Sequence, residues 1–166
     1  MKNLKNAKIS GGGDKEKEVF RELVETVFLF IHEHYAEYGS ILKDYDINYT
    51  QYVTLITVYM HGTLVEGDLA KMLYITPSTM SRMVFGLEER GWLKTARDRA
   101  DRRRVLVMLS DTGKRRMRGI RDKQAEVLAR RVQSLGEEQR EDVYRVAEFV
   151  NNALRYMIST PETDRE

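Results

Sequence analysis

Arginine is concentrated in one short segment of the chain. Residues 97–104 contain two aspartates, Asp98 and Asp101, and five arginines, Arg97, Arg99, Arg102, Arg103 and Arg104. Strand-like runs at residues 92–96 and 105–109 flank this segment, which makes it the tip of a predicted β-hairpin. Guanidinium groups at such a tip stay in solvent and pair well with phosphate. The pattern therefore predicts a wing that binds a polyanion such as nucleic acid.

The distribution of charge along the chain supports this prediction. The whole chain of 166 residues has a net charge of only +2. Residues 92–131 nevertheless contain fourteen basic and five acidic groups, a net charge of +9, whereas residues 14–47 and 132–166 carry −5 and −4. A local basic surface of this kind is typical of nucleic-acid binding. It argues against the alternative class, a winged helix that serves only as a protein–protein interaction module.

The sequence offers little that could support catalysis. It contains no cysteine, which excludes disulfides and thiolate metal sites. His32 and His34 are two residues apart, so on a helix they point to different sides and do not form a metal pair. We find no nucleophile with a base and no phosphate-binding loop, and we expect neither an enzyme nor a metal or cofactor. No apolar run approaches the roughly 20 residues of a membrane span and no export signal is present, so we expect a soluble cytoplasmic protein.

Apolar periodicity and capping signals predict the elements that position the hairpin. Thr76 can cap a helix that has Pro77 at its first position and ends at Gly91. A tight turn joins this helix to a short helix before it, and the two form a helix-turn-helix. The expected helices are 14 to about 38, ended by Gly39 and Ser40; 48 to about 60; 66–73; 77–90; one capped by Ser110 that runs to about 135; and a last one to about 158. Residues 63–65 suit a third strand beside the hairpin.

Two of these helices have more apolar surface than a single core needs. In the first helix, Phe20, Val24 and Phe28 belong to an apolar sector wider than the stripe of a little over 100° that one core requires. In the last helix, apolar residues such as Val143 and Val150 recur at near-heptad spacing. Both patterns predict association with a second copy of the chain.

The helix at residues 77–90 is the candidate recognition helix. Its apolar residues fall on one face and can dock, whereas its hydroxyl and arginine side chains lie toward the other. Small hydroxyl side chains let a helix N-terminus approach base edges and phosphates, and arginine pairs with guanine. In the alternative interpretation, Ser78 and Thr79 only extend the N-terminal cap and Arg82 pairs with Glu88 or Glu89. Because a basic wing follows, we favour DNA recognition by Thr76, Pro77, Ser78, Thr79, Ser81 and Arg82.

Residues 47–113 also resemble a known family, through a series of motifs in order and at matching spacing. These are Gln51-Tyr52 with Leu55, Gly62, Asp68-Leu69-Ala70, Pro77-Ser78-Thr79 with Ser81-Arg82, Leu87-Glu88-Glu89-Arg90-Gly91-Trp92-Leu93, Asp101-Arg102-Arg103, and Val107-Met108-Leu109-Ser110 with Gly113. With them the chain resembles the multiple antibiotic resistance regulator (MarR) family of winged-helix transcription factors. It departs from the family pattern at Tyr74, where glycine is frequent, and at Phe85-Gly86, which replaces a pair that is commonly charged or polar.

The resemblance implies a mainly α (α+β) fold, a winged helix-turn-helix with long N- and C-terminal dimerisation helices. The expected domains are a flexible N-terminal arm at residues 1–13, dimerisation helices at 14–47 and 114–160, a winged helix-turn-helix DNA-binding domain at 48–113, and a polar tail at 161–166.

The resemblance also implies a function. A homodimer would place two recognition helices in successive major grooves of a pseudo-palindromic double-stranded DNA operator and its wings in the flanking minor grooves. We expect a transcriptional regulator, and repression is the commoner behaviour in the family. By analogy, Asp101 supports Arg103, which enters the minor groove, while Arg97, Arg99 and Arg102 contact phosphates. The alternative for Arg103 is an ion pair with Asp101 at the strand edge.

Members of the family commonly lose DNA affinity when a small phenolic or anionic effector binds between the dimerisation helices and the winged domain. The candidates for such a pocket in this sequence are His34, Tyr38 and Tyr52. Ordinary core and interface packing is the alternative role for each of them.

Overall fold

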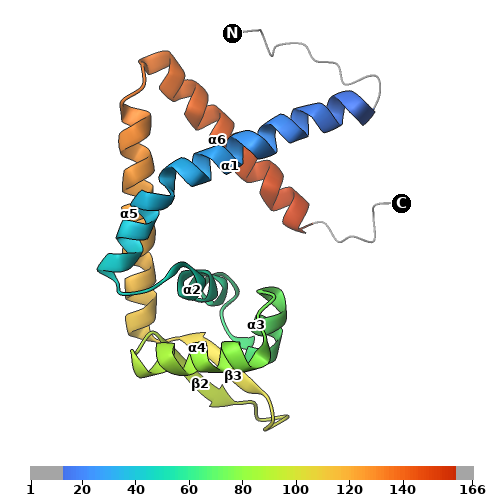
Figure 1. The fold of residues 1–166 in the computed structure, drawn as a ribbon, viewed down its shortest axis with the longest axis vertical. Coiled ribbons are helices and arrows are strands. Elements are labelled where there is room, and N and C mark those ends of the chain that lie inside the picture. Colours follow the sequence, from blue (N-terminus) through green and yellow to red (C-terminus); the bar gives the residue numbers. More distant parts are fainter. Residues whose placement is uncertain (1–12, 160–166) are drawn as a thin grey trace. The chain divides into compact units, whose positions relative to one another are not determined.

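The computed structural model describes residues 13–159 of the chain, with the side chains of most of them. Within this range lie six helices and three short strands (Figure 1): α1 (Gly13–Asp44), α2 (Tyr49–His61), β1 (Leu64–Val65), α3 (Glu66–Met72), α4 (Pro77–Glu89), β2 (Leu93–Arg97), β3 (Val105–Leu109), α5 (Asp111–Gln133) and α6 (Glu137–Ser159). Of the expected N-terminal arm, residues 1–12 lie outside the described residues and Gly13 begins α1; the expected tail at 161–166 also lies outside them. None of the described helices is both long and apolar enough to cross a membrane.

Helix α1 belongs to the first of two compact units, which ends at Tyr49. It continues through Gly39 and Ser40 to Asp44, so the end expected from the sequence is wrong. A glycine inside a helix costs only about 1 kcal/mol relative to alanine. Ile41 and Leu42 follow directly and are buried, with 7% and 4% of their surface exposed. Their burial outweighs the local preference of glycine and serine for a helix end.

The described residues from Thr50 onward form a second compact unit, which contains the winged helix-turn-helix. Its sheet has the strand order β1-β3-β2, with both outer strands antiparallel to β3. The register pairs Leu64 with Val107 on one side of β3 and Thr95 with Val107 on the other. Helices α3 and α4 pack against each other and against this sheet. The buried core of the unit comes from α2, α3, α4, the strands and the start of α5, and its fully buried large side chains are Leu55, Val58, Leu69, Met80, Leu87, Trp92, Val107, Met117 and Ile120.

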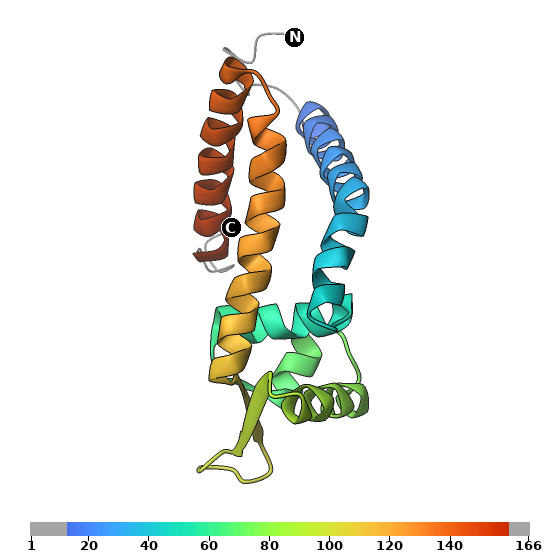
Figure 2. The same cartoon turned by 90° about the vertical axis from the view of Figure 1, so that its left-hand side faces the viewer.

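Helix α5 begins at a tight junction with the base of the hairpin. The Ser110 hydroxyl accepts a hydrogen bond from the Gly113 N–H at 2.9 Å and donates one to the Gly91 carbonyl at 2.6 Å. The Ser110 N–H donates to the Trp92 carbonyl at 3.0 Å. Gly113 lies so close to this carbonyl that a Cβ there would stand 2.0 Å from the oxygen. The junction therefore fixes the direction in which α5 leaves the winged domain, and α6 folds back from the far end of α5 (Figure 2).

Four of the described helices end with a residue in the left-handed region of φ. One is Gly62 after α2, with φ of +80°, and the other three share a second feature. These residues are Asp46 after α1, Tyr74 after α3 and Gly91 after α4, with φ of +53°, +53° and +70°. The following N–H reaches back to the last helical turn, as in the 2.9 Å bond from Ile75 to the Ala70 carbonyl, which is the hydrogen bond of a Schellman motif. Glycine adopts this conformation without strain and tyrosine does not. The frequent glycine of the related family at the Tyr74 position thus has a conformational reason.

Candidate nucleic-acid interface

A cluster of hydroxyl groups surrounds the N-terminus of α4. Thr76 is the N-cap, and its Oγ1 accepts a hydrogen bond from the Thr79 N–H at 3.3 Å. The same hydroxyl donates to the Thr79 Oγ1 at 2.9 Å and lies 3.3 Å from the Ser78 Oγ. Pro77 occupies the first turn, where no N–H is needed. The cluster caps the helix and also leaves its hydroxyl groups exposed. The same hydroxyl groups therefore fit both interpretations, an N-terminal cap and a surface for DNA recognition.

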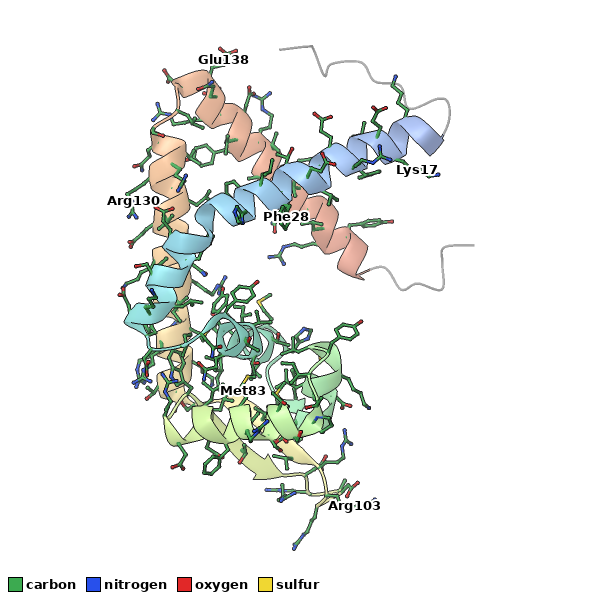
Figure 3. All side chains as sticks on the ribbon, in the orientation of Figure 1. Lys17, Phe28, Met83, Arg103, Arg130 and Glu138 are labelled. Atoms are coloured by element: carbon green, nitrogen blue, oxygen red, sulfur yellow. The ribbon has the colours of Figure 1, made fainter. Side chains whose placement is uncertain are left out.

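One face of α4 is open to solvent. Met80, Val84 and Leu87 are buried on the opposite face, and the Met83 sulfur accepts a hydrogen bond from a hydroxyl of α2 at 3.1 Å (Figure 3). Arg82 is exposed, and it has no ion pair among the described residues. The open face carries the exposed residues Ser78, Thr79, Ser81, Arg82, Phe85 and Glu89.

Two carboxylates of the helix-turn-helix hold α4 in place. Glu88, at the end of α4, accepts hydrogen bonds from the Thr95 N–H at 2.8 Å and the Thr95 Oγ1 at 2.9 Å. This carboxylate therefore connects α4 to the outer strand of the wing and does not pair with Arg82. Near the other end of α4, the Ser81 hydroxyl donates a hydrogen bond to Glu66 on α3. Ser81 thus has a partner within the domain while its surface remains exposed.

Arg103 and Asp101 form a pair at the tip of the wing. The Arg103 Nε and Nη2 donate to the two Asp101 carboxylate oxygens at 3.1 and 3.4 Å, and the Arg103 N–H donates to the same carboxylate at 3.0 Å. The Arg103 side chain is nevertheless 92% exposed and lies at the end of the hairpin (Figure 3). The Arg103 side chain, its backbone N–H and the charge of Arg104 together lower the pKa of the Asp101 carboxyl below its ordinary value of 3.8. The tip therefore presents an oriented guanidinium group beside an ionised carboxylate at neutral pH.

The other arginines of the wing divide into two groups. Arg97 donates to the Arg102 carbonyl across the tip at 3.3 Å, and Arg97, Arg99 and Arg102 are exposed. Arg104 turns back toward the domain, where it lies 3.8 Å from an Asp68 oxygen on α3 and 3.9 Å from an Asp98 oxygen. Arg104 therefore connects the loop end of β3 to α3, and the other four arginines remain at the tip of the wing.

The basic residues at the start of α5 are used largely within the domain. The Arg116 guanidinium lies 5.0 Å from the Trp92 ring centroid and donates to the Arg90 carbonyl at 3.4 Å. The Arg121 guanidinium lies 5.0 Å from the Tyr59 ring centroid and donates to the Tyr59 hydroxyl at 3.0 Å. Cation–π contacts of this kind stabilise the packing of α5 on α2 and on the wing base. The net charge of the basic segment thus overstates the charge that is free to meet DNA.

The residues predicted for an effector pocket are distributed over two units. The Tyr52 hydroxyl, in α2, donates to the Gln124 side chain of α5 at 3.0 Å. Tyr38 is a half-exposed residue of α1, and the side chain of His34 lies outside the described residues. The pocket itself stays a prediction.

Sequence reasoning missed the residues that position the site. Glu88, Thr95 and Arg104 act through contacts between segments that are distant in the chain or that lie across the hairpin, and periodicity does not reveal such contacts.

Comparison with known proteins places this domain in a family. Residues 47–105 match the family model of the MarR family. This segment of the chain is therefore a MarR-family domain. A curated relative, the HTH-type transcriptional regulator TtmR of Methylorubrum extorquens, is 28% identical over 112 residues, which cover 68% of this chain and 55% of the relative. The match thus spans about half the length of that relative.

Solved structures of similar proteins share the fold. A transcriptional regulator of Thermotoga maritima superposes with a TM-score of 0.72 at 20% identity, over 87% of this chain and 99% of the other. A mutant of Staphylococcus aureus MepR bound to an oligodeoxyribonucleotide superposes with a TM-score of 0.63 at 25% identity, over 80% and 97% of the two chains. The predicted winged helix-turn-helix fold of this chain is thereby confirmed.

Proposed function

We propose that this protein is a transcriptional regulator that binds a pseudo-palindromic DNA operator as a homodimer. The observation that carries the proposal is the wing tip. A solvent-exposed ion pair contributes at most about 1 kcal/mol to folding, and Arg103 is 92% exposed while three donors to Asp101 fix its orientation. An oriented guanidinium at the end of a hairpin suits the narrow, electronegative minor groove of DNA.

The open face of α4 supplies the second half of the proposed contact. Ser78 lies on this face at the helix N-terminus, where backbone N–H groups and the helix dipole favour a phosphate, and Arg82 lies one turn further along the same face. Arg82 is available to a guanine base because Glu88 is engaged by Thr95. In this arrangement α4 enters a major groove, and the wing reaches the minor groove beside it.

Exposed apolar surface supports the proposed homodimer. In α1, Val19, Phe20, Val24 and Phe28 are each at least 60% exposed. In α6, Val146, Val150 and Leu154 are 60%, 44% and 51% exposed, and they belong to the near-heptad apolar series of that helix. Exposed apolar side chains that recur along a helix favour an association site on that helix. A two-fold dimer would place its two α4 helices on half-sites about 10 bp apart or a multiple of that distance.

We further propose that the protein acts as a repressor that a small phenolic or anionic effector releases. The Tyr52–Gln124 hydrogen bond offers a phenol and an amide that such a molecule could contact. Such a ligand would bind more tightly to a dimer whose recognition helices are displaced than to the dimer that fits DNA. The ratio of the ligand's affinities for these two conformations sets the factor by which it lowers operator affinity. Titration of the protein–DNA complex with salicylate and related phenols tests this; an affinity that does not change with any of them contradicts the effector proposal alone.

Selection of bound duplexes from a random DNA pool tests the main proposal. We expect an inverted repeat, and a logarithm of affinity that falls linearly with the logarithm of salt concentration. In fluorescence anisotropy at fixed salt, Arg103→Ala should weaken binding at least tenfold, because a dimer loses two contacts of about 1 kcal/mol or more each. Arg145→Ala is the matched control, since Arg145 is an exposed arginine paired with Asp142 at 2.9 Å on α6. Recovery of no preferred sequence, or equal affinity of the Arg103 variant and the wild type, contradicts the proposal.

A further inference from the structure

An aromatic side chain shares the open face of α4 with the candidate DNA-reading residues. Phe85 is 65% exposed, and positions 78, 81, 82 and 85 have the spacing i, i+3, i+4, i+7 of a single helix face. Homeodomain helices present their base-contacting side chains to the major groove with the same spacing. We propose, on the basis of the function proposed above, that Phe85 is a specificity-determining residue that recognises thymine through its 5-methyl group.

The chemistry of the major groove selects thymine for this side chain. The methyl group of thymine is the apolar feature among the base edges in that groove, and phenylalanine is one of the side chains that contact it. A polar base edge offers the ring no partner and would lose hydrating water on contact. With the rise of about 1.5 Å per residue, Phe85 lies about 10 Å along α4 from Ser78, or about three base pairs. It would therefore read a base pair well separated from the one at the helix N-terminus.

The packing of α4 prevents Phe85 from leaving this face. Met80, Val84 and Leu87 are each at most 2% exposed on the opposite side, so the helix cannot rotate without exposing them. The next residue, Gly86, has no atom within 4 Å of the position of a Cβ, apart from its chain neighbours and the nearby helix backbone, so no other side chain covers the helix surface at that position.

Charge defines the limits of the contacted stretch. Arg82, one turn before Phe85, has no described ion pair and favours the approach of DNA. Glu89, one turn after Phe85, is exposed and repels phosphates. The proposed contact of Phe85 thus lies at the C-terminal end of the part of α4 that would contact DNA.

A cycle of protein and base substitutions tests the proposal. Duplexes from the random-pool selection are synthesised with each thymine in turn replaced by deoxyuridine, which removes only the 5-methyl group. Affinities are measured for the wild type, Phe85→Ala and Phe85→Leu. One or two replacements per half-site should weaken wild-type binding about fourfold, the equivalent of one buried methyl group. The same replacements should leave Phe85→Ala unchanged, and Phe85→Leu should keep part of the effect.

Tyr74→Ala is the matched control, because it removes an aromatic side chain that is 99% exposed in the turn before α4 and off its face. This variant should keep the wild-type sensitivity to deoxyuridine. Equal sensitivity of the wild type and Phe85→Ala at every thymine overturns the inference and leaves the proposed function standing. If no sequence-specific duplex is recovered, the proposed function fails and the inference with it. Sedimentation of Phe85→Ala as a dimer of unchanged mass separates a base contact from a subunit contact; a change to monomers would also overturn the inference.

Discussion

Replacement of Gly113 by alanine tests the junction between the winged domain and α5. The new Cβ would stand 2.0 Å from the Trp92 carbonyl oxygen, 3.0 Å from the Trp92 carbonyl carbon and 3.2 Å from a Leu109 methyl group. The first atom is backbone and cannot rotate away. Relief requires a shift of about 1 Å, because real Cβ atoms keep at least 3.0 Å from such neighbours.

This shift has a calculable cost. It strains the 3.0 Å bond from the Ser110 N–H to the Trp92 carbonyl and displaces the Ser110 hydroxyl that caps α5. Overpacking costs about 1–3 kcal/mol, and loss of an N-cap costs about 1 kcal/mol. We expect Gly113→Ala to lower the free energy of unfolding by about 3 kcal/mol. For a chain of this size that lowers Tm by about 6–12 °C.

Thermal and urea denaturation, followed by circular dichroism at one protein concentration, measures this loss. Gly86→Ala is the matched control, since it makes the same change inside a helix with no atom within 4 Å of the new Cβ. It should stabilise the protein by up to about 1 kcal/mol through helix propensity. A Gly113→Ala variant with a Tm within about 2 °C of the wild type refutes the reasoning.

Three further predictions concern the turn, the wing strand and the wing tip. Tyr74→Gly should raise Tm by a few degrees, because it removes about 1 kcal/mol of left-handed strain from a side chain that is 99% exposed and makes no stabilising contact; a lower Tm in calorimetry counts against this. Glu88→Ala should lower the free energy of unfolding by about 1.5 kcal/mol through loss of both bonds to Thr95, and in a double-mutant cycle with Thr95→Val the two losses should not add; additive losses would show that the contact contributes nothing. In an NMR titration the pKa of Asp101 should lie below 3.8 and return toward it in Arg103→Gln. Because the folded state lowers this pKa, the stabilisation it provides is present above pH 3.8 and is lost as the pH falls through the folded value; an unchanged pKa in Arg103→Gln contradicts the pairing.

Local signals in the sequence were sufficient for much of the fold. Thr76 and Ser110 each cap a helix by accepting a hydrogen bond from an N–H group only a few residues later in the chain. Both caps are present in the structure. The helix-turn-helix and the hairpin follow from such signals together with apolar periodicity. The end of α1 was predicted wrongly because Gly39 is a local signal, whereas the burial of Ile41 and Leu42 depends on the folded protein.

The candidate site was only partly predictable for the same reason. The pair of Asp101 and Arg103 is two residues apart and follows from local geometry. The inward turn of Arg104 toward Asp68 and the packing of Arg116 on Trp92 join distant segments of the chain. From the sequence alone, these arginines were included in the positive charge that could bind DNA. The structure assigns them to the framework that positions the wing.

Hydroxyl-radical footprinting of the selected duplex tests the central claim most directly. The account predicts protection in the minor grooves that flank two half-sites, arranged symmetrically about the centre of the operator. Under conditions where Arg103→Ala still occupies the duplex, the outer protections should disappear while the centre stays protected. A footprint without two-fold symmetry, or one whose flanks are the same in the wild type and in Arg103→Ala, would contradict the account.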